Sequence, residues 1–347
     1  MTPPPSASLG VGILAHNEAA RLPALLGSLF RQSVFTSGRP VTVACIANGC
    51  TDDTAGVARR HLADATAQPE RAHVTWMVEE LARPGKANAW NHCVHQALRS
   101  SDYLCLIDAD IVFASDATIA NALAVLLEDP LVQVVTDRPM KRVLSESGWL
   151  SELSRRFSAA TPPGPTEICG QFYCARAAAL RTIWLPPGLP VEDGFLRAMI
   201  ITDEFRAPED ARRIRRADNA AHFFEPKIRM GEVWRHKKRL MIGTTLNHLL
   251  FRHLWQEAGS RGAGELLRDE LQRDPDWLAQ YLARQCERRT WVVPLGHVFR
   301  RVRDLRHVPA GQATRRAPAA LAATALDLLA AVSANRAIKR NLGLGYW

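Results

Sequence analysis

The sequence lacks several features of secreted, zinc-stabilised and membrane-spanning proteins. None of its seven cysteines forms a C-x-x-C pair, which argues against a disulfide framework or a zinc ribbon. The opening residues, MTPPPSASLG, contain no basic segment followed by an apolar stretch, so no secretory signal is predicted. The longest run of low charge, residues 317–334, is rich in alanine and contains Asp327, which disfavours a membrane-spanning helix. These absences predict a cytoplasmic protein.

Charge is distributed unevenly along the chain. Residues 1–150 hold 12 basic and 15 acidic side chains, whereas residues 151–347 hold 32 basic and 20 acidic ones. A basic surface favours an anionic partner, such as phospholipid headgroups, a phosphorylated substrate or nucleic acid. Base stacking needs aromatic residues or a reading module, and the chain has only four tyrosines and no module that we recognise. We therefore expect no nucleic acid partner, and a salt-titrated oligonucleotide-binding assay tests this alternative.

Short apolar runs alternate with longer amphipathic stretches over the first 140 residues, and this pattern predicts an α/β fold with a mostly parallel, Rossmann-like sheet flanked by helices. Strands are expected at 9–15, 41–47, 74–80, 103–109 and 132–138, and helices near 18–32, 52–65, 86–100 and 115–128. Farther along, the pattern predicts helices at 146–158 and 191–203, strands at 168–176 and 219–226, and a helical region over 231–340.

Two carboxylates stand at the end of the expected strand YLCLIDA. Asp108 and Asp110 are two residues apart, at the edge of the sheet where open α/β folds bind their ligands. Such a pair can share a hard cation that bridges a diphosphate, so the sequence predicts Mg²⁺ or Mn²⁺ bound by Asp108 and Asp110.

Further motifs surround this pair in a fixed order. They are Asn17-Glu18 with Leu22, Asn48-Gly49-Cys50-Thr51-Asp52, Gly85-Lys86 with Asn91, Gly170-Gln171-Phe172 and Glu192-Asp193. This array resembles the family 2 glycosyltransferases, and the resemblance covers roughly residues 9–245. It implies a GT-A fold, with a nucleotide-binding half at about 1–140 and an acceptor half at about 141–245. Residues 246–347 would then form a separate helical region.

The resemblance implies a role for each matching residue on the donor side. It places the nucleotide of the donor near Ala15, Glu18, Asn48, Lys86 and Asp108. Where the family has D-D-G-S, this chain has Ala47-Asn48-Gly49-Cys50, so an amide replaces a carboxylate. Asparagine can still accept and donate hydrogen bonds at a pyrimidine edge, and the donor that the resemblance implies is a UDP-sugar.

The resemblance also implies the catalytic residues. In inverting relatives, the aspartate of the E-D pair takes the proton from the acceptor hydroxyl, which here is Asp193, with Glu192 beside it. Gly170 and Gln171 would lie on the acceptor side. The segment Arg235–Gly243 is similar to the Q-x-x-R-W region of membrane-associated synthases, although Leu240 replaces the tryptophan. It places Arg239 near the diphosphate, because the guanidinium fork suits phosphate oxygens.

The sequence thus predicts a metal-dependent, inverting hexosyltransferase that uses a nucleotide sugar. A sugar nucleotidyltransferase of related fold is the alternative, but the turn AHNEAARLP lacks the Gly-rich loop with which such enzymes usually open. The acceptor is not identified, and a lipid-linked one is among the options. In residues 284–340, arginines alternate with apolar residues such as Trp291, Val292, Val293, Val298 and Phe299. This pattern predicts an in-plane contact with an anionic membrane on its cytoplasmic face, or a helical cover for the sheet domain or for an oligomer.

Overall fold

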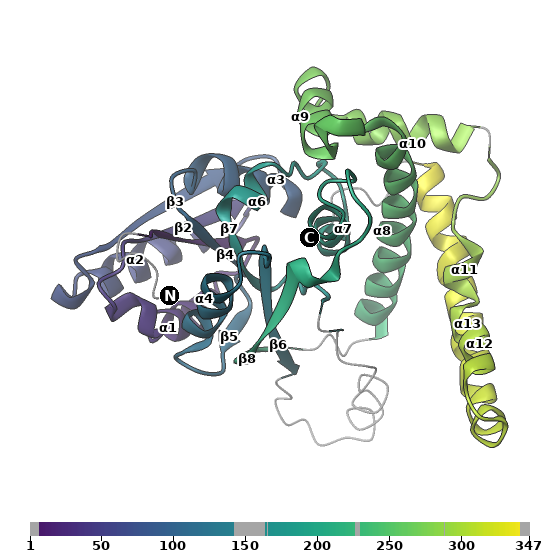
Figure 1. The fold of residues 1–347 in the computed structure, drawn as a ribbon, viewed down its shortest axis with the longest axis horizontal. Helices are drawn as coiled ribbons and strands as arrows, with labels where there is room; N and C mark the ends of the chain where they lie inside the picture. Colours follow the sequence, from purple (N-terminus) through teal and green to yellow (C-terminus); the bar gives the residue numbers. More distant parts are fainter. Residues whose placement is uncertain (1–6, 142–163, 165, 226–229, 288, 341–347) are drawn as a thin grey trace.

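The computed structural model describes residues 7–141, 164, 166–225, 230–287 and 289–340 (Figure 1). The helix expected at 146–158 lies outside these residues. The other expected elements that precede residue 226 are all found, with shifted ends, and residues 231–340 are helical as predicted.

A single sheet of eight strands forms the centre of the fold, in the order β3-β2-β1-β4-β7-β6-β8-β5. The strands β1 to β4 pair in parallel, as predicted, whereas β7 is antiparallel to both of its neighbours and β5 is antiparallel to β8. The strands are β1 (Leu9–Ala15), β2 (Val41–Asn48), β3 (Val74–Leu81), β4 (Tyr103–Asp108), β5 (Ile111–Phe113), β6 (Val134–Lys141), β7 (Phe172–Arg176) and β8 (Ile214–Phe224).

Helices cover both faces of the sheet, which explains why the strands of the parallel half are nearly continuous apolar runs. Two buried clusters result, one on each face. One face is covered by α1 (Leu22–Leu29), α2 (Thr54–Thr66) and α4 (Thr118–Glu128), and the other by α3 (Lys86–His92), α6 (Ala177–Arg181) and α7 (Glu192–Ile201).

Close packing on the second face explains a glycine in the middle of β1. A Cβ atom added to Gly12 would lie 2.3 Å from the Sγ atom of Cys93, which directly follows α3. The absence of a side chain therefore lets this segment pack directly on the strand, and Cys93 and Trp90 are both buried there.

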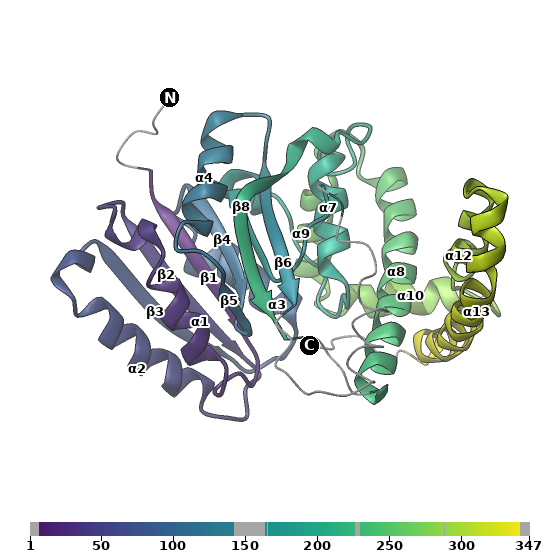
Figure 2. The same ribbon diagram turned by 90° about the horizontal axis from the view of Figure 1, so that it is seen from below.

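The C-terminal region is helical and shares the core of the sheet domain. It comprises α8 (Met230–Glu257), α9 (Ala263–Arg273), α10 (Trp277–Glu287), α11 (Leu295–Val298), α12 (Arg300–Asp304) and α13 (Ala310–Lys339). α8 stands between the sheet and the helices α12 and α13 (Figures 1 and 2). The buried cluster on the α7 face continues through α8, α9 and α10 to α13. The division expected at residue 245 stays a prediction, and α8 runs across it without a break.

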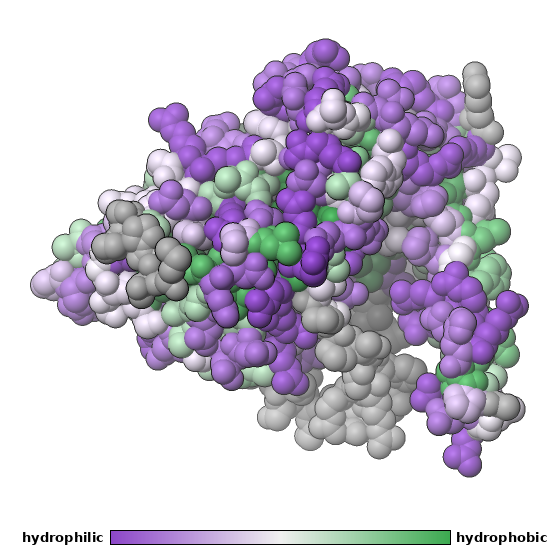
Figure 3. Space-filling view, in the orientation of Figure 1, coloured by the Kyte–Doolittle hydropathy of each residue, from purple (hydrophilic) through white to green (hydrophobic). Residues whose placement is uncertain are grey.

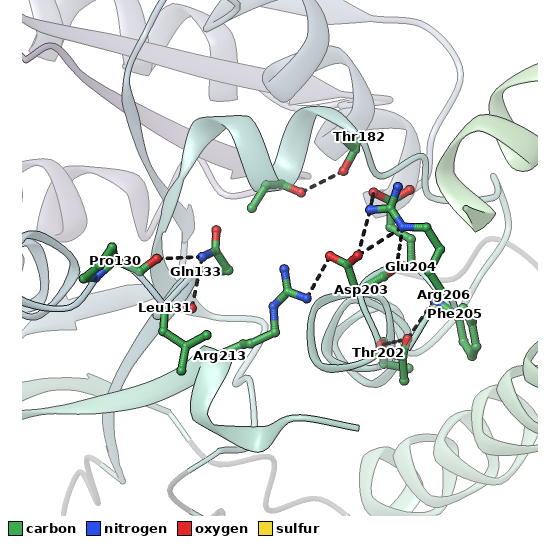
Figure 4. Close-up of polar contacts among 12 residues, drawn as sticks. Pro130, Leu131, Gln133, Thr182, Thr202, Asp203, Glu204, Phe205, Arg206 and Arg213 are labelled. Atoms are coloured by element: carbon green, nitrogen blue, oxygen red, sulfur yellow. Dashed lines mark hydrogen bonds and ion pairs between the residues drawn. The ribbon is translucent and has the colours of Figure 1, made fainter. Parts of the chain in front are cut away.

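A tight turn after α7 joins the sheet domain to α9. Asp203, Glu204 and Phe205 all have a positive φ, and the Asp203 carboxylate lies between Arg206 and Arg213 at distances of 3.0 and 2.8 Å (Figure 4). The Oε2 atom of Glu204 accepts a hydrogen bond of 3.0 Å from the backbone N–H of Gly264. This bond satisfies a free N–H group in the first turn of α9 and fixes that helix to the end of α7.

Candidate active site

The predicted site residues lie at one edge of the sheet. Because β1, β2 and β4 are parallel neighbours, their carboxyl ends meet there. Leu14 of β1 lies opposite Asp108 of β4, and Ala15 lies opposite Ala47 of β2. Residues from three distant parts of the sequence are therefore side by side.

Lys86 is the centre of the site. Its Nζ atom lies 2.7 Å from Asp108 Oδ1 and 2.9 Å from Glu192 Oε1, and it donates a hydrogen bond of 2.9 Å to the Gly170 carbonyl. Burial alone would lower the pKa of Lys86, but the two carboxylates outweigh burial and raise it above its usual value. Lys86 is therefore a fixed ammonium group that joins the end of β4 to the start of α7.

Gly170 is packed tightly against this ion-pair cluster. A Cβ atom at this position would lie 3.1 Å from Glu192 Oε1 and 3.3 Å from Lys86 Nζ, and 3.5 Å from the Cβ atom of Asp193. The backbone just before β7 thus approaches both acidic residues closely, and a larger residue would displace them. The structure brings Gly170 together with Lys86, Glu192 and Asp193.

The two acidic residues at the start of α7 have different environments. Glu192 is buried between Lys86 and Arg239, whose Nη2 atom is 3.9 Å from Glu192 Oε2. Burial acts to raise the pKa of Glu192, but the two cations lower it, so this carboxylate is ionised. The Glu192 carboxylate is therefore engaged by two cationic side chains of the protein.

Asp193, by contrast, forms no ion pair with any described residue. Its Oδ1 atom accepts a hydrogen bond of 2.7 Å from the backbone N–H of Gly194. Burial raises the pKa of Asp193 to about 6, and the neighbouring charge of Glu192 adds to this effect. A carboxylate that forms no ion pair and has a raised pKa is suited to accept a proton.

Arg239 reaches the site from α8. Its Nε atom donates a hydrogen bond of 2.8 Å to the carbonyl of Pro190, two residues before Glu192. Together with its contact to Glu192, this bond holds the start of α7 in place. The predicted contact of Arg239 with a diphosphate stays a prediction.

Asn48 and the turn after it form the other end of the site. The Asn48 side chain is fully buried, and its Nδ2 atom donates a hydrogen bond of 2.7 Å to the Gly85 carbonyl. Its Oδ1 atom has no hydrogen-bond partner among the described residues. The next residue, Gly49, has a φ of 61°, and a Cβ atom there would lie 2.6 Å from the Cβ atom of Pro84. The turns after β2 and β3 can therefore meet at this point only with glycine at position 49.

Glu18 lies at the same edge. Its carboxylate accepts a hydrogen bond of 3.1 Å from Arg21, and burial raises its pKa, with the charge of Asp110 adding to the effect. Asp52 of the second motif accepts hydrogen bonds of 3.1 Å from the backbone N–H groups of Ala19 and Thr54. Asp52 thus fixes the loop that carries Glu18.

The two acidic residues of the D-x-D motif also differ. Asp108 faces Lys86, and burial raises its pKa to about 6, although Lys86 opposes the rise. Asp110 is partly exposed and makes no hydrogen bond or ion pair with the described residues. The strand β5 begins directly after Asp110, and its first residue, Ile111, lies opposite Phe224 of β8.

The residues around the D-x-D motif offer few ligands to a divalent cation. No group of three or more His, Cys, Asp or Glu side chains that could hold a metal gathers in the described part of the chain. Mg²⁺, however, commonly takes one or two carboxylates and completes its shell with substrate phosphates and water. The unengaged oxygens of Asp110 suit that arrangement, whereas Asp108 already has a cation partner. The assignment of the metal to Asp110 and Asp108 stays a prediction.

The structure adds two residues that the sequence analysis did not single out. His222 of β8 and Asp137 of β6 are both fully buried, with 2.8 Å between His222 Nδ1 and Asp137 Oδ2. The other ring nitrogen of His222 lies 3.3 Å from the side-chain oxygen of Gln171. Gln171 therefore turns its side chain toward His222, while its carbonyl accepts a hydrogen bond of 2.8 Å from Asp108 N–H. The strands that carry them, VVTDRPMK and IRRADNAAHFF, contain several other polar and charged residues, so no signal in the sequence singled out this pair.

Comparison with known proteins identifies related families and folds. The family model described as glycosyl transferase family 2 matches residues 11–196, more than half of the chain. No curated protein matches the chain in sequence.

Several solved structures are similar to this chain. The mannosyltransferase PcManGT from Pyrobaculum calidifontis, in complex with GDP-Man and Mn²⁺, is 18% identical with a TM-score of 0.52, over 94% of this chain and 89% of that chain. S. aureus TarS 1-349 in complex with UDP is 16% identical with a TM-score of 0.46, over 96% and 92%. Glucosyl-3-phosphoglycerate synthase from Mycobacterium tuberculosis, in complex with Mn²⁺, UDP and glucosyl-3-phosphoglycerate, is 17% identical with a TM-score of 0.48, over 70% and 80%. The likeness to PcManGT shows a shared fold and agrees with the fold class predicted above.

Proposed function

The chain belongs to glycosyl transferase family 2, and we propose that it is an inverting, metal-dependent enzyme that transfers a sugar from a UDP-sugar to an acceptor hydroxyl. The proposal rests on one observation: the carboxylates around Lys86 differ in whether they form an ion pair. Lys86 pairs with Asp108 and Glu192, which leaves Asp193 on one side and Asp110 on the other as carboxylates without an ion-pair partner among the described residues.

Asp193 is the proposed general base. As the acceptor oxygen attacks the anomeric carbon, its hydroxyl must lose a proton, and Asp193 can accept it because it is ionised at neutral pH and bound to no cation. Glu192 cannot serve equally well, since Lys86 and Arg239 stabilise its ionised form and lower its pKa. Glu192 is instead a positioning residue that fixes the first turn of α7.

On the opposite side, the leaving nucleoside diphosphate requires a positive environment. Asp110, with Asp108 behind it, would hold a Mg²⁺ or Mn²⁺ ion that acts as a Lewis acid on the departing diphosphate. Lys86 and Arg239 add two fixed cations from the protein itself. Their charges offset those of Asp108 and Glu192, so these carboxylates repel the departing diphosphate less.

The proposed nucleotide site lies at the buried end, near Ala15, Glu18 and Asn48. The Asn48 oxygen that lacks a partner supports this assignment, because it would accept a hydrogen bond from the N–H group of a uracil ring. The sugar would then extend toward Lys86 and Asp193. Gly170 and Gln171 are proposed to line the acceptor side, and a lipid-linked acceptor would fit the basic C-terminal region.

The proposed compartment is the cytoplasm. All seven cysteines are free thiols, including Cys105 and Cys174, which lie directly opposite each other in the β4–β7 pair. Neighbouring thiols of this kind are expected where the surroundings are reducing.

The test is to incubate the protein with a panel of nucleotide sugars and Mn²⁺ and to identify the phosphorus product by ³¹P NMR. Release of a nucleoside diphosphate, abolished by a chelator, supports the proposal. Release of pyrophosphate from a sugar phosphate and a nucleoside triphosphate would instead identify a nucleotidyltransferase. If the diphosphate is released at an unchanged rate after complete chelation, the metal dependence is disproved and the proposed glycosyl transfer is not.

A further inference from the structure

The outward face of α13 is unusual for a surface helix. Between Arg316 and Arg336, Asp327 is the only charged residue. Leucines on this stretch are exposed: Leu321 and Leu329 at 59%, Leu326 at 51% and Leu328 at 42%. An apolar solvent face of this length is what a binding surface presents, since surface helices normally carry polar residues there. Figure 3 shows apolar residues reaching the surface along the right-hand edge, over α12 and α13.

The Asp327 charge, which was expected to disfavour a membrane-spanning helix, is paired with two cations in the structure. The carboxylate of Asp327 lies 2.6 Å from Lys237 Nζ of α8 and 3.3 Å from Arg301 Nε of α12. By length and composition, the segment Gly311–Lys339 is in fact sufficient to cross a membrane, contrary to the expectation from the sequence, and only 22% of its most apolar stretch is buried. Asp327 faces inward and leaves the outer face apolar.

The same contacts exclude a spanning orientation while the fold is intact. Lys237 fixes the middle of α13 to α8, and Asn335 fixes its C-terminal part through hydrogen bonds of 2.8 Å with Val292 N–H and 3.1 Å with the Thr290 carbonyl. α13 is thus held alongside the sheet domain. A helix held in this way can lie in the plane of a bilayer surface but cannot enter it end-on.

A groove between α8 and α13 adds a site for anions beside this face. It has a volume of about 490 Å³ and is lined by Trp234, Lys238, Leu329, Val332, Ser333, Arg336, Ala337 and Arg340. Neither Lys238, Arg336 nor Arg340 pairs with an acidic group in the described part of the chain, whereas the neighbours of Lys238 in sequence, Lys237 and Arg239, both do. Three cations that have no acidic partner among the described residues, next to apolar side chains and a tryptophan, match the surface of an anionic phospholipid bilayer.

We propose that the outer face of α13 and the groove between α8 and α13 form a docking site for an anionic phospholipid bilayer, with α13 lying in the membrane plane. A second copy of the chain is a poorer occupant, because the face is flanked by cations at both ends, Arg315 and Arg316 at one and Arg336 and Arg340 at the other. Like charges would oppose each other across a dimer, whereas an anionic surface attracts both ends.

This surface differs in part from the one expected from the sequence. Val292, Val293 and Val298 are buried and cannot touch a membrane, whereas Phe299 is 47% exposed. The leucines of α13 take the place of the buried valines. The three valines are not at the surface because they pack in the buried core to which α13 also contributes.

The position of the groove suggests how an acceptor reaches the enzyme, a step that rests on the proposed function. Lys238 lines the groove and the next residue, Arg239, contacts Glu192 in the active site. Adjacent residues of α8 therefore reach the groove on one side of the helix and the E-D pair on another. An acceptor hydroxyl on a lipid anchored at the groove would lie close to Asp193.

The test is co-sedimentation of the full chain with phosphatidylcholine vesicles that contain increasing fractions of phosphatidylglycerol. We expect binding that rises with the anionic fraction and falls with salt. Replacing Lys238, Arg336 and Arg340 with glutamine should weaken it by about 100-fold, given the usual contribution of a basic residue near such a surface. Part of the binding to vesicles should remain at high salt. Replacing Leu321, Leu328 and Leu329 with serine should abolish this salt-resistant part. The double variant Arg31→Gln/Arg99→Gln, which changes exposed arginines of the sheet domain, is the matched control and should bind as the wild type does.

Several outcomes would overturn the inference. They are absence of binding by the wild-type chain at low salt, equal loss in the control variant, or a leucine-dependent dimer in analytical ultracentrifugation. The salt and lipid dependence of the wild-type chain decides the question even where a variant fails to fold. Release of nucleoside diphosphate from a soluble donor, measured without vesicles, tests the proposed function separately, so the failure of one can be distinguished from the failure of the other.

Discussion

Replacing Asp193 with asparagine is the change whose effect the structure defines most clearly. Asp193 and Glu192 are adjacent, but only Glu192 has cationic partners, Lys86 and Arg239. The amide keeps the shape of the side chain and can still accept the hydrogen bond from Gly194 N–H. The substitution therefore removes proton acceptance while leaving the Lys86 cluster intact.

The expected magnitude has two parts. Loss of a general base costs about 10²–10⁴-fold in kcat, and we expect donor affinity to change by less than about twofold. Because the pKa of Asp193 is about 6, roughly nine tenths of its carboxyls are ionised at pH 7 and about one tenth at pH 5. The base acts only when ionised, so kcat of the wild-type enzyme should fall by about tenfold as the pH is lowered from 7 to 5. The residual rate of the variant should lack this dependence.

The assay is the release of nucleoside diphosphate from a donor that the wild-type enzyme hydrolyses, with donor affinity measured by calorimetry. Asp64→Asn is the matched control, because Asp64 is exposed on α2 and makes no hydrogen bond or ion pair with the described residues. The control should keep the wild-type rate and pH profile. If Asp193→Asn retains a rate within threefold of the wild type, or the same pH profile, Asp193 is not the base and the reasoning fails.

Three further predictions follow from the cluster. Asp110→Ala should remove most of the turnover, by about 10²-fold or more, and should weaken Mn²⁺ binding measured calorimetrically in the presence of UDP; unchanged Mn²⁺ affinity would contradict the metal assignment. Lys86→Met should lower the free energy of unfolding in urea by about 3–5 kcal/mol, because it leaves the buried Asp108 and Glu192 without their shared cation; a loss below about 1 kcal/mol would contradict the central role of the lysine. Gly170→Val should reduce kcat while its β-sheet content in circular dichroism stays unchanged, because the added atoms displace Glu192 and Lys86; unchanged kcat would refute the close approach.

Much of the parallel half of the fold was predictable because its strands are buried on both faces. LGVGILA and VTVACIA read as apolar runs, and the structure has strands at Leu9–Ala15 and Val41–Asn48. The remaining half was harder. The strand expected at 103–109 ends at Asp108, within the D-x-D motif, and Ile111–Phe113 forms a further strand, paired with β8, that was not predicted. β8 itself begins five residues earlier than expected, in the charged stretch at Ile214, because its partner β6 supplies the pairing.

The candidate site was likewise predictable only in part. Motif order identified Lys86, Asp108, Gly170, Glu192 and Asp193, and the structure brings them together. The sequence could not show which acidic residue would be engaged, because that depends on a lysine more than a hundred positions away from Glu192. The pairing of Asp137 with His222 was equally invisible, since it depends on two strands that are neighbours only in the folded sheet.

The anomeric configuration of the first product formed tests the account most directly. With an α-linked nucleotide sugar and water as the acceptor, ¹H NMR at times shorter than mutarotation distinguishes the two anomers of the released sugar. A single displacement in which Asp193 deprotonates the attacking oxygen predicts the β anomer, and Asp193→Asn should abolish its formation. Release of the α anomer would contradict the account, because retention requires a different mechanism from direct attack by an acceptor that Asp193 activates.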